Sequence, residues 1–229
     1  MSEQTKTKRV KPILGGILSG GYSSRMGQPK DRILLADGRP MIQHVLDTLL
    51  SVCNEVIVSG PEIPVELNED ERVQFIKDNF PGKGPLAGIE AILSTGKARG
   101  YLIVACDQPL LKEELLRALV PNDRDVPCFF DLSESGYIQP FPGYYPVSWL
   151  PDIRDSLRRN RRAIKSLIAD SDVILKDIDP NLKKYIRSIN TQEDLLSLND
   201  PECDAAEQNT DSKHQHDKAS CRISGHDHQ

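Results

Sequence analysis

The sequence lacks the features that mark membrane, secreted or nucleic-acid-binding proteins. No apolar run approaches the roughly 20 residues that cross a bilayer. The first residues, MSEQTKTKRVKP, are polar, so we expect no secretory signal. The 29 basic residues are outnumbered by 34 acidic ones, and no basic stripe suggests a nucleic-acid surface. We therefore expect a cytoplasmic protein with no membrane or nucleic-acid partner.

Cysteine is also scarce, and its spacing shows no pairing. The five cysteines are scattered over the chain, at positions 53, 106, 128, 203 and 221. An odd, dispersed set fits a reducing compartment better than a disulfide framework.

The distribution of charge and apolar residues predicts one folded domain with two polar ends. The net charge is −5, and residues 200–229 carry seven acids and three bases, which leaves the rest near neutrality. That segment holds four histidines and almost no apolar side chain, so we expect an acidic, His-containing disordered tail. We interpret residues 1–11 as a flexible extension and residues 12–199 as the folded domain.

Short apolar segments alternate with amphipathic ones in the first half of the domain. Strands are expected at 12–18, 55–60, 73–78 and 101–107, and helices at 41–52, 85–93 and 112–120. Such alternation is typical of an α/β fold with a doubly wound, mostly parallel, Rossmann-like sheet covered on both faces.

The second half is less regular. Residues 125–132 are expected to form a strand, and the prolines of 137–147 favour an edge strand or a loop lining a cleft. A basic helical region, 149–168, should break near Asn160; its arginines either form a solvated face or attract an acidic partner. Thr191 and Asp194 are spaced as in a helix N-terminus.

A glycine-rich loop follows the first predicted strand, in the stretch LSGGYSSRMGQPK from Leu18 to Lys30. It matches neither the Walker loop nor the dinucleotide fingerprint. Gly20 and Gly21 would still let consecutive backbone N–H groups approach an anion. Arg25 offers a planar fork for phosphate oxygens and Lys30 a mobile charge. Two cations in one loop favour a triphosphate, or two phosphorylated substrates, over a solvated turn.

Two aspartates end predicted strands and so belong to the same sheet edge. Asp107 ends the most apolar strand, where open α/β sheets place their ligands. A carboxylate facing a triphosphate suits Mg²⁺, and the alternative is a helix N-cap before PLLKEELL. Asp78 ends another strand, and Gly82, Gly84 and Gly88 follow it in a turn that would make room for a flat ring or a ribose.

These segments together resemble the molybdenum cofactor guanylyltransferase family, part of a larger group of Rossmann-like nucleotidyltransferases related to nucleotide-diphospho-sugar transferases. The resemblance rests on LSGGYSSRMGQPK, DNFPGKGPLAGI, ACDQPLL and SINTQEDL, in that order, and covers roughly residues 12 to 198. The first motif alone indicates only the wider group, and GPLAGI and INTQEDL favour the molybdenum branch.

The resemblance implies transfer of GMP from Mg²⁺-bound GTP to the terminal phosphate of Mo-molybdopterin, with release of pyrophosphate. Molybdoenzymes or their chaperones are possible recipients of the product. The resemblance also implies a role for each site residue. The nucleotide is contacted by Asp78, by Asp107 and by the backbone of Leu18, Ser19, Gly20 and Gly21, and its phosphates are held by Arg25 and Lys30. Asp107 ligates Mg²⁺ as well, and Asn190 lies toward the pterin.

The residue inventory agrees with this chemistry, because a phosphate acceptor is already an anionic nucleophile and needs no histidine base. The body holds only His44, inside a predicted helix, where we interpret it as a helix-face residue.

Two other functions remain open from the sequence. The family often has an aspartate before the lysine; Pro29, which stands here, is also common in relatives that use CTP or other acceptors. The alternative enzyme is therefore a cytidylyltransferase or another nucleotidyltransferase with a sugar- or alcohol-phosphate acceptor. The alternative outside enzymes is a nucleotide-binding chaperone or regulatory subunit that has lost turnover.

Overall fold

The structure is a computed structural model that describes residues 13–20, 22–23, 28–62, 70–121, 125–132, 137–161 and 163–198. The predicted extension and acidic tail lie outside these residues, as do Gly21 and Arg25. The chain divides after Asn190 into two units, and the second is described here only by its helix α6 (Gln192–Leu198). In the described part of the chain, no helix combines the length and apolarity that a bilayer crossing demands.

The first unit contains nine strands, five α-helices and three 3-10 helices among its described residues. In chain order they are β1 (Ile13–Leu18), β2 (Tyr22–Ser23), β3 (Gln28–Pro29), η1 (Lys30–Arg32), α1 (Met41–Leu50), β4 (Val56–Ser59), β5 (Val73–Ile76), α2 (Pro85–Ser94), β6 (Gly100–Ala105), α3 (Glu113–Leu119), β7 (Cys128–Leu132), β8 (Tyr137–Pro146), η4 (Val147–Trp149), α4 (Leu150–Arg158), α5 (Ile164–Ala169), β9 (Ile174–Asp177) and η5 (Pro180–Ile186).

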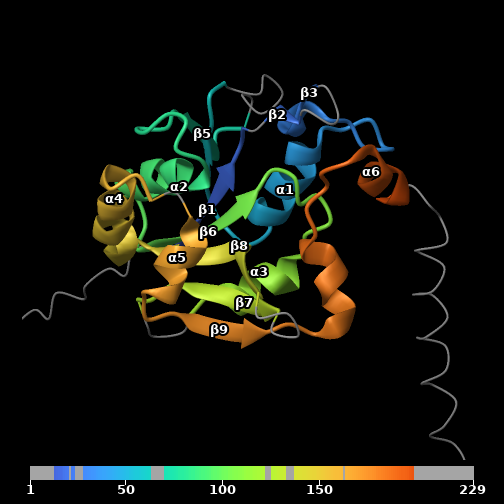
Figure 1. The fold of residues 1–229 in the computed structure, drawn as a ribbon. Coiled ribbons are helices and arrows are strands. Elements are labelled where there is room, and N and C mark those ends of the chain that lie inside the picture. The colour runs from blue at the N-terminus through green and yellow to red at the C-terminus, as the bar shows by residue number, and fades with distance from the viewer. Residues whose placement is uncertain are drawn as a thin grey trace, which may run out of the picture. The chain divides into compact units, whose positions relative to one another are not determined.

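Seven of these strands form one sheet in the order β5-β4-β1-β6-β8-β7-β9 (Figure 1). The pairs β5–β4, β4–β1, β1–β6 and β7–β9 are parallel, and β8 runs antiparallel to both of its neighbours. The prediction of an α/β fold with a mostly parallel sheet is therefore confirmed.

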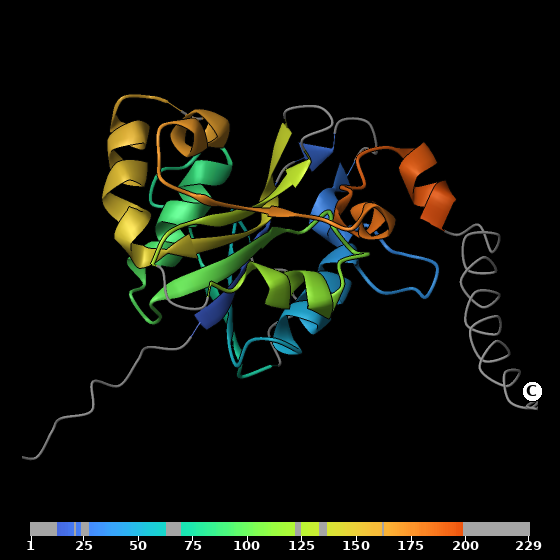
Figure 2. The same cartoon turned by 90° about the horizontal axis from the view of Figure 1, so that it is seen from below.

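Helices cover both faces of the sheet, as Figure 2 shows. On one face, α1 and α3 bury leucine, isoleucine and valine side chains against β1, β4 and β6. On the other face, α2, α4 and α5 pack around Tyr101, Phe129 and Trp149. Two apolar layers on either side of a sheet are the doubly wound arrangement that the sequence predicts.

Two glycines inside β1 let the helices on both faces approach this central strand. A Cβ on Gly15 would lie 2.9 Å from Cγ2 of Val56 and 3.3 Å from Leu49 of α1. A Cβ on Gly16 would lie 3.1 Å from both Ile103 and Ile92, the latter on α2. These glycines therefore serve the packing of the strand.

Residues 137–146 form a strand, as predicted, but the edge or loop position expected from their prolines was wrong, because β8 lies inside the sheet between β6 and β7. Its pairing with β7 jumps from Gly143, opposite Phe129, to Gln139, opposite Phe130. Pro140 and Pro142 lie in the segment between these two residues, which the β7 register skips. A bulge of this kind places prolines where no ladder hydrogen bond is required, so an interior strand tolerates them.

Other differences concern the C-terminal half. The strand β9 and the helix η5 were not predicted. The break near Asn160 is confirmed: α4 ends at Arg158, α5 begins at Ile164, and Asn160 has a φ of 58° between them. The predicted N-terminus of α6 is confirmed too, because Thr191 and Asp194 exchange side-chain-to-backbone hydrogen bonds.

Candidate nucleotide site

The predicted site residues that the structure describes lie where β1, β4 and β6 end side by side. Leu18 is paired with Ser59 of β4 and Ala105 of β6. Just beyond, the amide of Ser19 donates to the carbonyl of Ser59 at 2.8 Å, and the amide of Cys106 donates to the carbonyl of Leu18 at 3.2 Å. This carboxyl edge of a parallel sheet is where α/β proteins bind ligands.

Lys30, Asp107 and Asn190 form a cluster at this edge. The Nζ of Lys30 donates to Oδ2 of Asp107 at 2.8 Å and to Oδ1 of Asn190 at 2.5 Å. The side chains of Lys30 and Asp107 are only 20% and 13% exposed, so the ion pair is shielded from bulk water on most sides. Three residues from distant motifs are thus brought together as the sequence predicts.

Asp107 is not a helix N-cap, which removes the alternative interpretation of this residue. Helix α3 begins at Glu113 and is capped by Lys112. The carbonyl of Asp107 instead accepts a hydrogen bond from the amide of Ile189 at 2.8 Å, one residue before Asn190. This backbone contact brings the end of the first unit to the site.

The neighbouring Gln108 fixes the same region and was missed by sequence reasoning. Its side chain is fully buried, and Nε2 donates to the carbonyls of Phe141 and Ile186 at 2.8 Å each. A buried amide with two carbonyl partners ties the strand end to two separate segments. The only sequence signal was a polar residue directly after an apolar strand.

Asp31 is a second carboxylate at this edge that the sequence did not mark. It lies in η1, is 9% exposed, and its Oδ2 accepts from the hydroxyl of Ser19 at 2.8 Å. A signal existed in retrospect: an aspartate directly after a loop lysine, followed by the apolar run from Ile33.

Asp78 is placed beside the loop by Ser59, whose hydroxyl donates to Oδ1 of the aspartate at 2.5 Å. Gly88 of α2 lies against this pair: a Cβ there would meet Leu18 at 2.8 Å, Ser59 at 3.5 Å and Asp78 at 3.6 Å. The space at Gly88 is therefore filled by protein, and the prediction that it makes room for a ring or ribose was wrong at this glycine. Gly82 is open, with nothing within 4 Å of a Cβ.

Gly20 needs to be glycine for a backbone reason. Its φ is +124°, a conformation that L side chains rarely adopt, and a Cβ would approach Pro61 at 3.0 Å. The turn after β1 thus depends on Gly20.

Neither Cys106 nor His44 is suited to a catalytic role. Burial, together with the carboxylates of Asp107 and Asp31, raises the pKa of the Cys106 thiol to about 12, so it is not a thiolate at neutral pH. His44 lies on α1, where its ring nitrogens contact Arg39 and Asp37. This confirms the interpretation of His44 as a helix-face residue.

Asp107 fits a divalent cation. Its Oδ1 is buried and has no hydrogen-bond partner among the described residues. A carboxylate oxygen with free lone pairs is a ligand that Mg²⁺ accepts, with phosphate oxygens and waters completing its shell. No group of three or more His, Cys, Asp or Glu side chains suited to a metal occurs within the described ranges, so phosphate oxygens would be needed.

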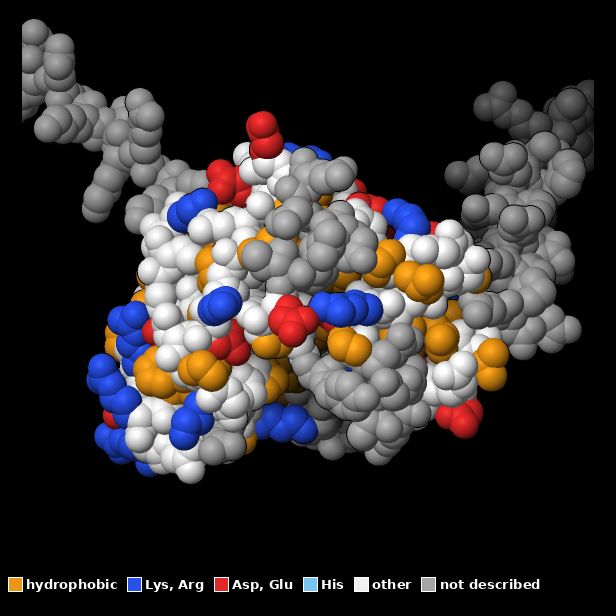
Figure 3. Space-filling view, turned by 90° about the horizontal axis from the view of Figure 1, so that it is seen from above, with side chains coloured by type: hydrophobic (Ala, Val, Ile, Leu, Met, Phe, Trp, Pro, Cys, Tyr) orange, Lys and Arg blue, Asp and Glu red, His pale blue; other side chains and the backbone are white. Residues whose placement is uncertain are grey.

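Figure 3 shows the molecule from above, and acidic and basic side chains are mixed near the middle of this face. Basic side chains gather instead toward the side where α4 lies. Arg158, Arg159 and Arg161 are exposed at the end of that helix, and Arg159 pairs with Asp155 of its own helix. This arrangement matches the solvated-face interpretation of the basic region.

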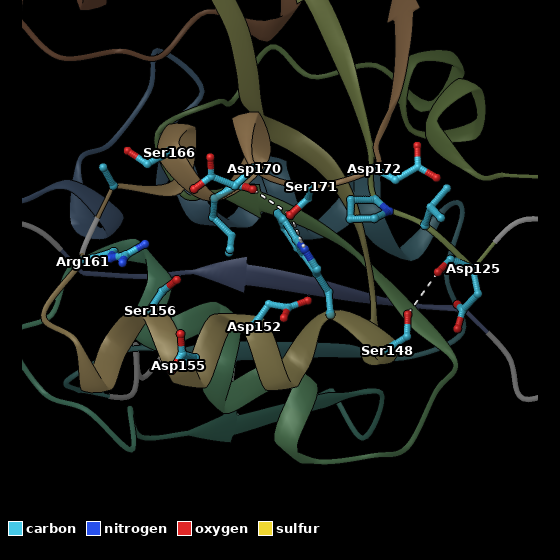
Figure 4. A pocket seen from close by; sticks show the side chains of 15 residues that line it. Asp125, Ser148, Asp152, Asp155, Ser156, Arg161, Ser166, Asp170, Ser171 and Asp172 are labelled. Carbon is cyan, nitrogen blue, oxygen red and sulfur yellow. Dashed lines mark hydrogen bonds between the residues drawn. The ribbon is translucent and has the colours of Figure 1, made fainter.

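A separate pocket of about 480 Å³ is lined by the segment before β7, by η4 and by α4 and α5, and it contains none of the predicted site residues (Figure 4). Trp149 forms one wall, with its indole N–H donating to Ser171, and Ser148 donates to the carbonyl of Asp125. Pro146, where β8 ends, is opposite Gly100, where β6 begins. The pocket is therefore near the amino end of β6, away from the carboxyl edge.

The mostly parallel sheet, with a glycine turn, a lysine and carboxylates at its carboxyl edge, defines an α/β nucleotide-binding protein. The comparisons make this specific. The chain belongs to the family described as the MobA-like NTP transferase domain, whose model matches residues 15–174. It is accordingly a nucleotidyltransferase, as predicted.

Relatives with assigned activities cover most of the chain. A probable molybdenum cofactor guanylyltransferase from Carboxydothermus hydrogenoformans is 33% identical over 191 residues, which are 81% of this chain and 89% of that one. A molybdenum cofactor guanylyltransferase from Desulfosudis oleivorans is 29% identical over 189 residues, covering 80% and 92%.

Solved structures confirm the fold. Molybdopterin-guanine dinucleotide biosynthesis protein A from Archaeoglobus fulgidus superposes with a TM-score of 0.68 at 23% identity, covering 81% of this chain and 96% of that one. 2-C-methyl-D-erythritol 4-phosphate cytidylyltransferase from Thermus thermophilus gives 0.58 at 15% identity, covering 81% and 96%.

Proposed function

We propose that this protein is a molybdenum cofactor guanylyltransferase. It transfers GMP from GTP to the terminal phosphate of Mo-molybdopterin and releases pyrophosphate. The observation that supports this proposal most directly is the hydrogen-bonded cluster of Lys30, Asp107 and Asn190. These residues come from the first, third and last of the motifs on which the resemblance rests. The names of relatives that span four fifths of the chain support the choice of reaction.

In this reaction a phosphate oxygen of the acceptor attacks the α-phosphorus of GTP. The bond from that phosphorus to the bridging oxygen breaks, and pyrophosphate leaves with the electron pair. The attacking oxygen is already anionic, so no side chain has to remove a proton. Catalysis then depends on positioning and on neutralising charge.

The described residues supply these two effects. Lys30 exchanges part of its contact with Asp107 and Asn190 for phosphate oxygens. The resemblance assigns a second phosphate contact to Arg25, which lies outside the described residues. Asp107 would hold Mg²⁺ through Oδ1, which has no hydrogen-bond partner among the described residues. When bound, this ion neutralises phosphate charge and makes pyrophosphate a better leaving group.

The nucleotide lies over the turn after β1. The backbone of Leu18, Ser19, Gly20 and Gly21 meets the guanine nucleotide, because the positive φ of Gly20 opens this turn. Asp78, held by Ser59, accepts hydrogen bonds from the N–H groups of the base. Asn190 lies on the acceptor side of Lys30.

We also place the protein in the cytoplasm, with GTP and Mo-molybdopterin as substrates and molybdoenzymes or their chaperones as recipients of the product. The scattered cysteines support this location, and Cys53, Cys106 and Cys128 are free thiols.

Nucleotide binding tests the proposal. Affinities for GTP, CTP and ATP are measured by calorimetry, each with Mg²⁺ and with EDTA. We expect GTP to bind most tightly and to depend on Mg²⁺. Preference for CTP would support the cytidylyltransferase alternative instead. GTP binding without pyrophosphate release in the presence of Mo-molybdopterin would support a chaperone.

A further inference from the structure

The two carboxylate oxygens of Asp31 differ in their hydrogen bonding. One oxygen, Oδ2, accepts from Ser19, and the other, Oδ1, is buried and has no hydrogen-bond partner among the described residues. Asp107 shows the same division: Oδ2 accepts from Lys30, and Oδ1 is buried without a partner there. A buried carboxylate oxygen without a partner is costly unless a ligand or cation completes it.

The two carboxylates belong to one small region. Ser19, the partner of Asp31, follows Leu18, and Cys106 donates its amide to the carbonyl of that leucine. Asp107 is the residue after Cys106. Asp31, through Ser19, and Asp107, through Cys106, are therefore both linked to the end of β1.

The balance of charge favours a cation between them. The described part of the site holds three carboxylates, Asp31, Asp78 and Asp107, for one lysine, Lys30, which bonds to Asp107. A nucleotide triphosphate would add further negative charge. Carboxylates and phosphates come together in proteins where a divalent cation is shared between them.

We propose that Asp31 is a second carboxylate ligand of the divalent cation that accompanies the nucleotide, with Asp107 as the first. Each aspartate contributes its Oδ1, and phosphate oxygens and waters supply the remaining positions. The hydroxyl of Ser19 orients the Asp31 carboxylate. This inference rests on the proposed function, because it assigns a residue of the same nucleotide site.

The test separates metal ligation from support of the loop. GTP affinity is measured with Mg²⁺ and with EDTA, and Mn²⁺ affinity of the GTP complex is followed by electron paramagnetic resonance. The variants are Asp31→Asn, Asp107→Asn and, as a control, Asp37→Asn at an exposed carboxylate. Ser19→Ala removes the hydrogen bond to Asp31 but keeps its charge.

We expect Asp31→Asn and Asp107→Asn each to weaken Mn²⁺ binding about tenfold or more, because each removes one charged ligand. In EDTA, Asp31→Asn should bind GTP as tightly as wild type or more tightly, since a negative charge near the phosphates is gone. Ser19→Ala should change Mn²⁺ affinity much less than Asp31→Asn, and Asp37→Asn should have no effect.

Equal losses of GTP affinity with and without metal in Asp31→Asn would overturn the inference and assign Asp31 to loop support. Unchanged Mn²⁺ affinity in that variant would overturn it as well. Asp31→Ser gives the same comparison if Asp31→Asn does not fold. If wild type binds no GTP, the proposed function fails, and Mn²⁺ binding with pyrophosphate as the probe still tests Asp31 separately.

Discussion

Lys30 and Asp107 are 77 residues apart in the sequence, and the Nζ of Lys30 donates to Oδ2 of Asp107 at 2.8 Å. The pair joins the glycine loop to the end of β6, and Asn190 accepts a second hydrogen bond from the same ammonium group. The lysine is thus held at the sheet edge before any phosphate arrives, which limits the reorganisation that substrate binding requires.

Replacing Lys30 by methionine should lower kcat/KM for guanylyl transfer about 100-fold or more, because a cation aimed at the transferred phosphate is lost. Lys97→Met is the matched control, since Lys97 forms only an exposed pair with Glu55 at 3.5 Å. Steady-state pyrophosphate release measures both variants. Activity of Lys30→Met within threefold of wild type would show that the lysine has no role in transfer.

Replacing Asp78 should weaken binding of the guanine base and leave binding of the phosphates unchanged. We expect Asp78→Asn to lower GTP affinity about tenfold, because an amide cannot accept from two base N–H groups as a carboxylate does. Binding of inorganic tripolyphosphate should stay unchanged. Asp70→Asn, at an exposed aspartate paired with Arg72, is the control. A parallel loss of GTP and tripolyphosphate affinity would place Asp78 at the phosphates instead.

Much of this fold follows from local pattern. The alternation of apolar strands and amphipathic helices predicts the doubly wound sheet, and aspartates at strand ends are expected at one edge because parallel strands end together. The interior position of β8 was not predictable from its prolines. That position depends on a bulge which lets the register with β7 skip Pro140 and Pro142, and the bulge is a property of the pairing.

The candidate site was likewise predictable where it depends on short motifs and not where it depends on tertiary packing. Lys30 and Asp107 stand out in short motifs with a physical rationale. Asp31 does not, because its role depends on a hydrogen bond from Ser19 and on its burial within η1. The contact of Lys30 with Asn190, 160 residues away, is set by the packing of the whole unit.

A buried carboxylate on α2 allows a stability test away from the site. Glu90 is 1% exposed and binds Arg154 at 2.8 Å, with Asn79 and Ser94 as further donors. Arg154→Ala should lower the free energy of unfolding by about 1–3 kcal/mol at pH 7, since a charge is left without its cation. Arg158→Ala, an exposed arginine of the same helix, should cost less than about 0.5 kcal/mol.

The pH dependence of this loss has a defined sign. Burial opposes ionisation of Glu90, but its hydrogen bonds and Arg154 outweigh burial, and its pKa is lowered below 4.5. The ionised form therefore contributes stability above that value, and the contribution is lost as pH falls through the folded pKa. Urea unfolding should show the difference between Arg154→Ala and wild type shrinking as the solution is acidified from pH 7. A difference that grows on acidification would contradict this role of Glu90.

Gly100 offers a second test of the fold. A Cβ at this position would lie 2.3 Å from the hydroxyl oxygen of Tyr144 and 2.5 Å from its Cζ. The ring is fully buried and cannot move aside, so Gly100→Ala should destabilise the protein by about 2 kcal/mol. Thermal unfolding measures the change, and GTP affinity of the folded protein should be retained because Gly100 lies at the opposite end of β6. If Gly100→Ala were as stable as wild type, the packing around Tyr144 would be looser than described.

Pyrophosphate release tests the central claim most directly. Purified protein is incubated with Mo-molybdopterin, Mg²⁺ and GTP, CTP or ATP, and the product is identified by mass spectrometry. We expect pyrophosphate and a guanine dinucleotide from GTP, little product from CTP or ATP, and loss of release in Asp107→Asn. Faster release from CTP, or full release by Asp107→Asn, would contradict the proposed guanylyltransferase and its metal site respectively.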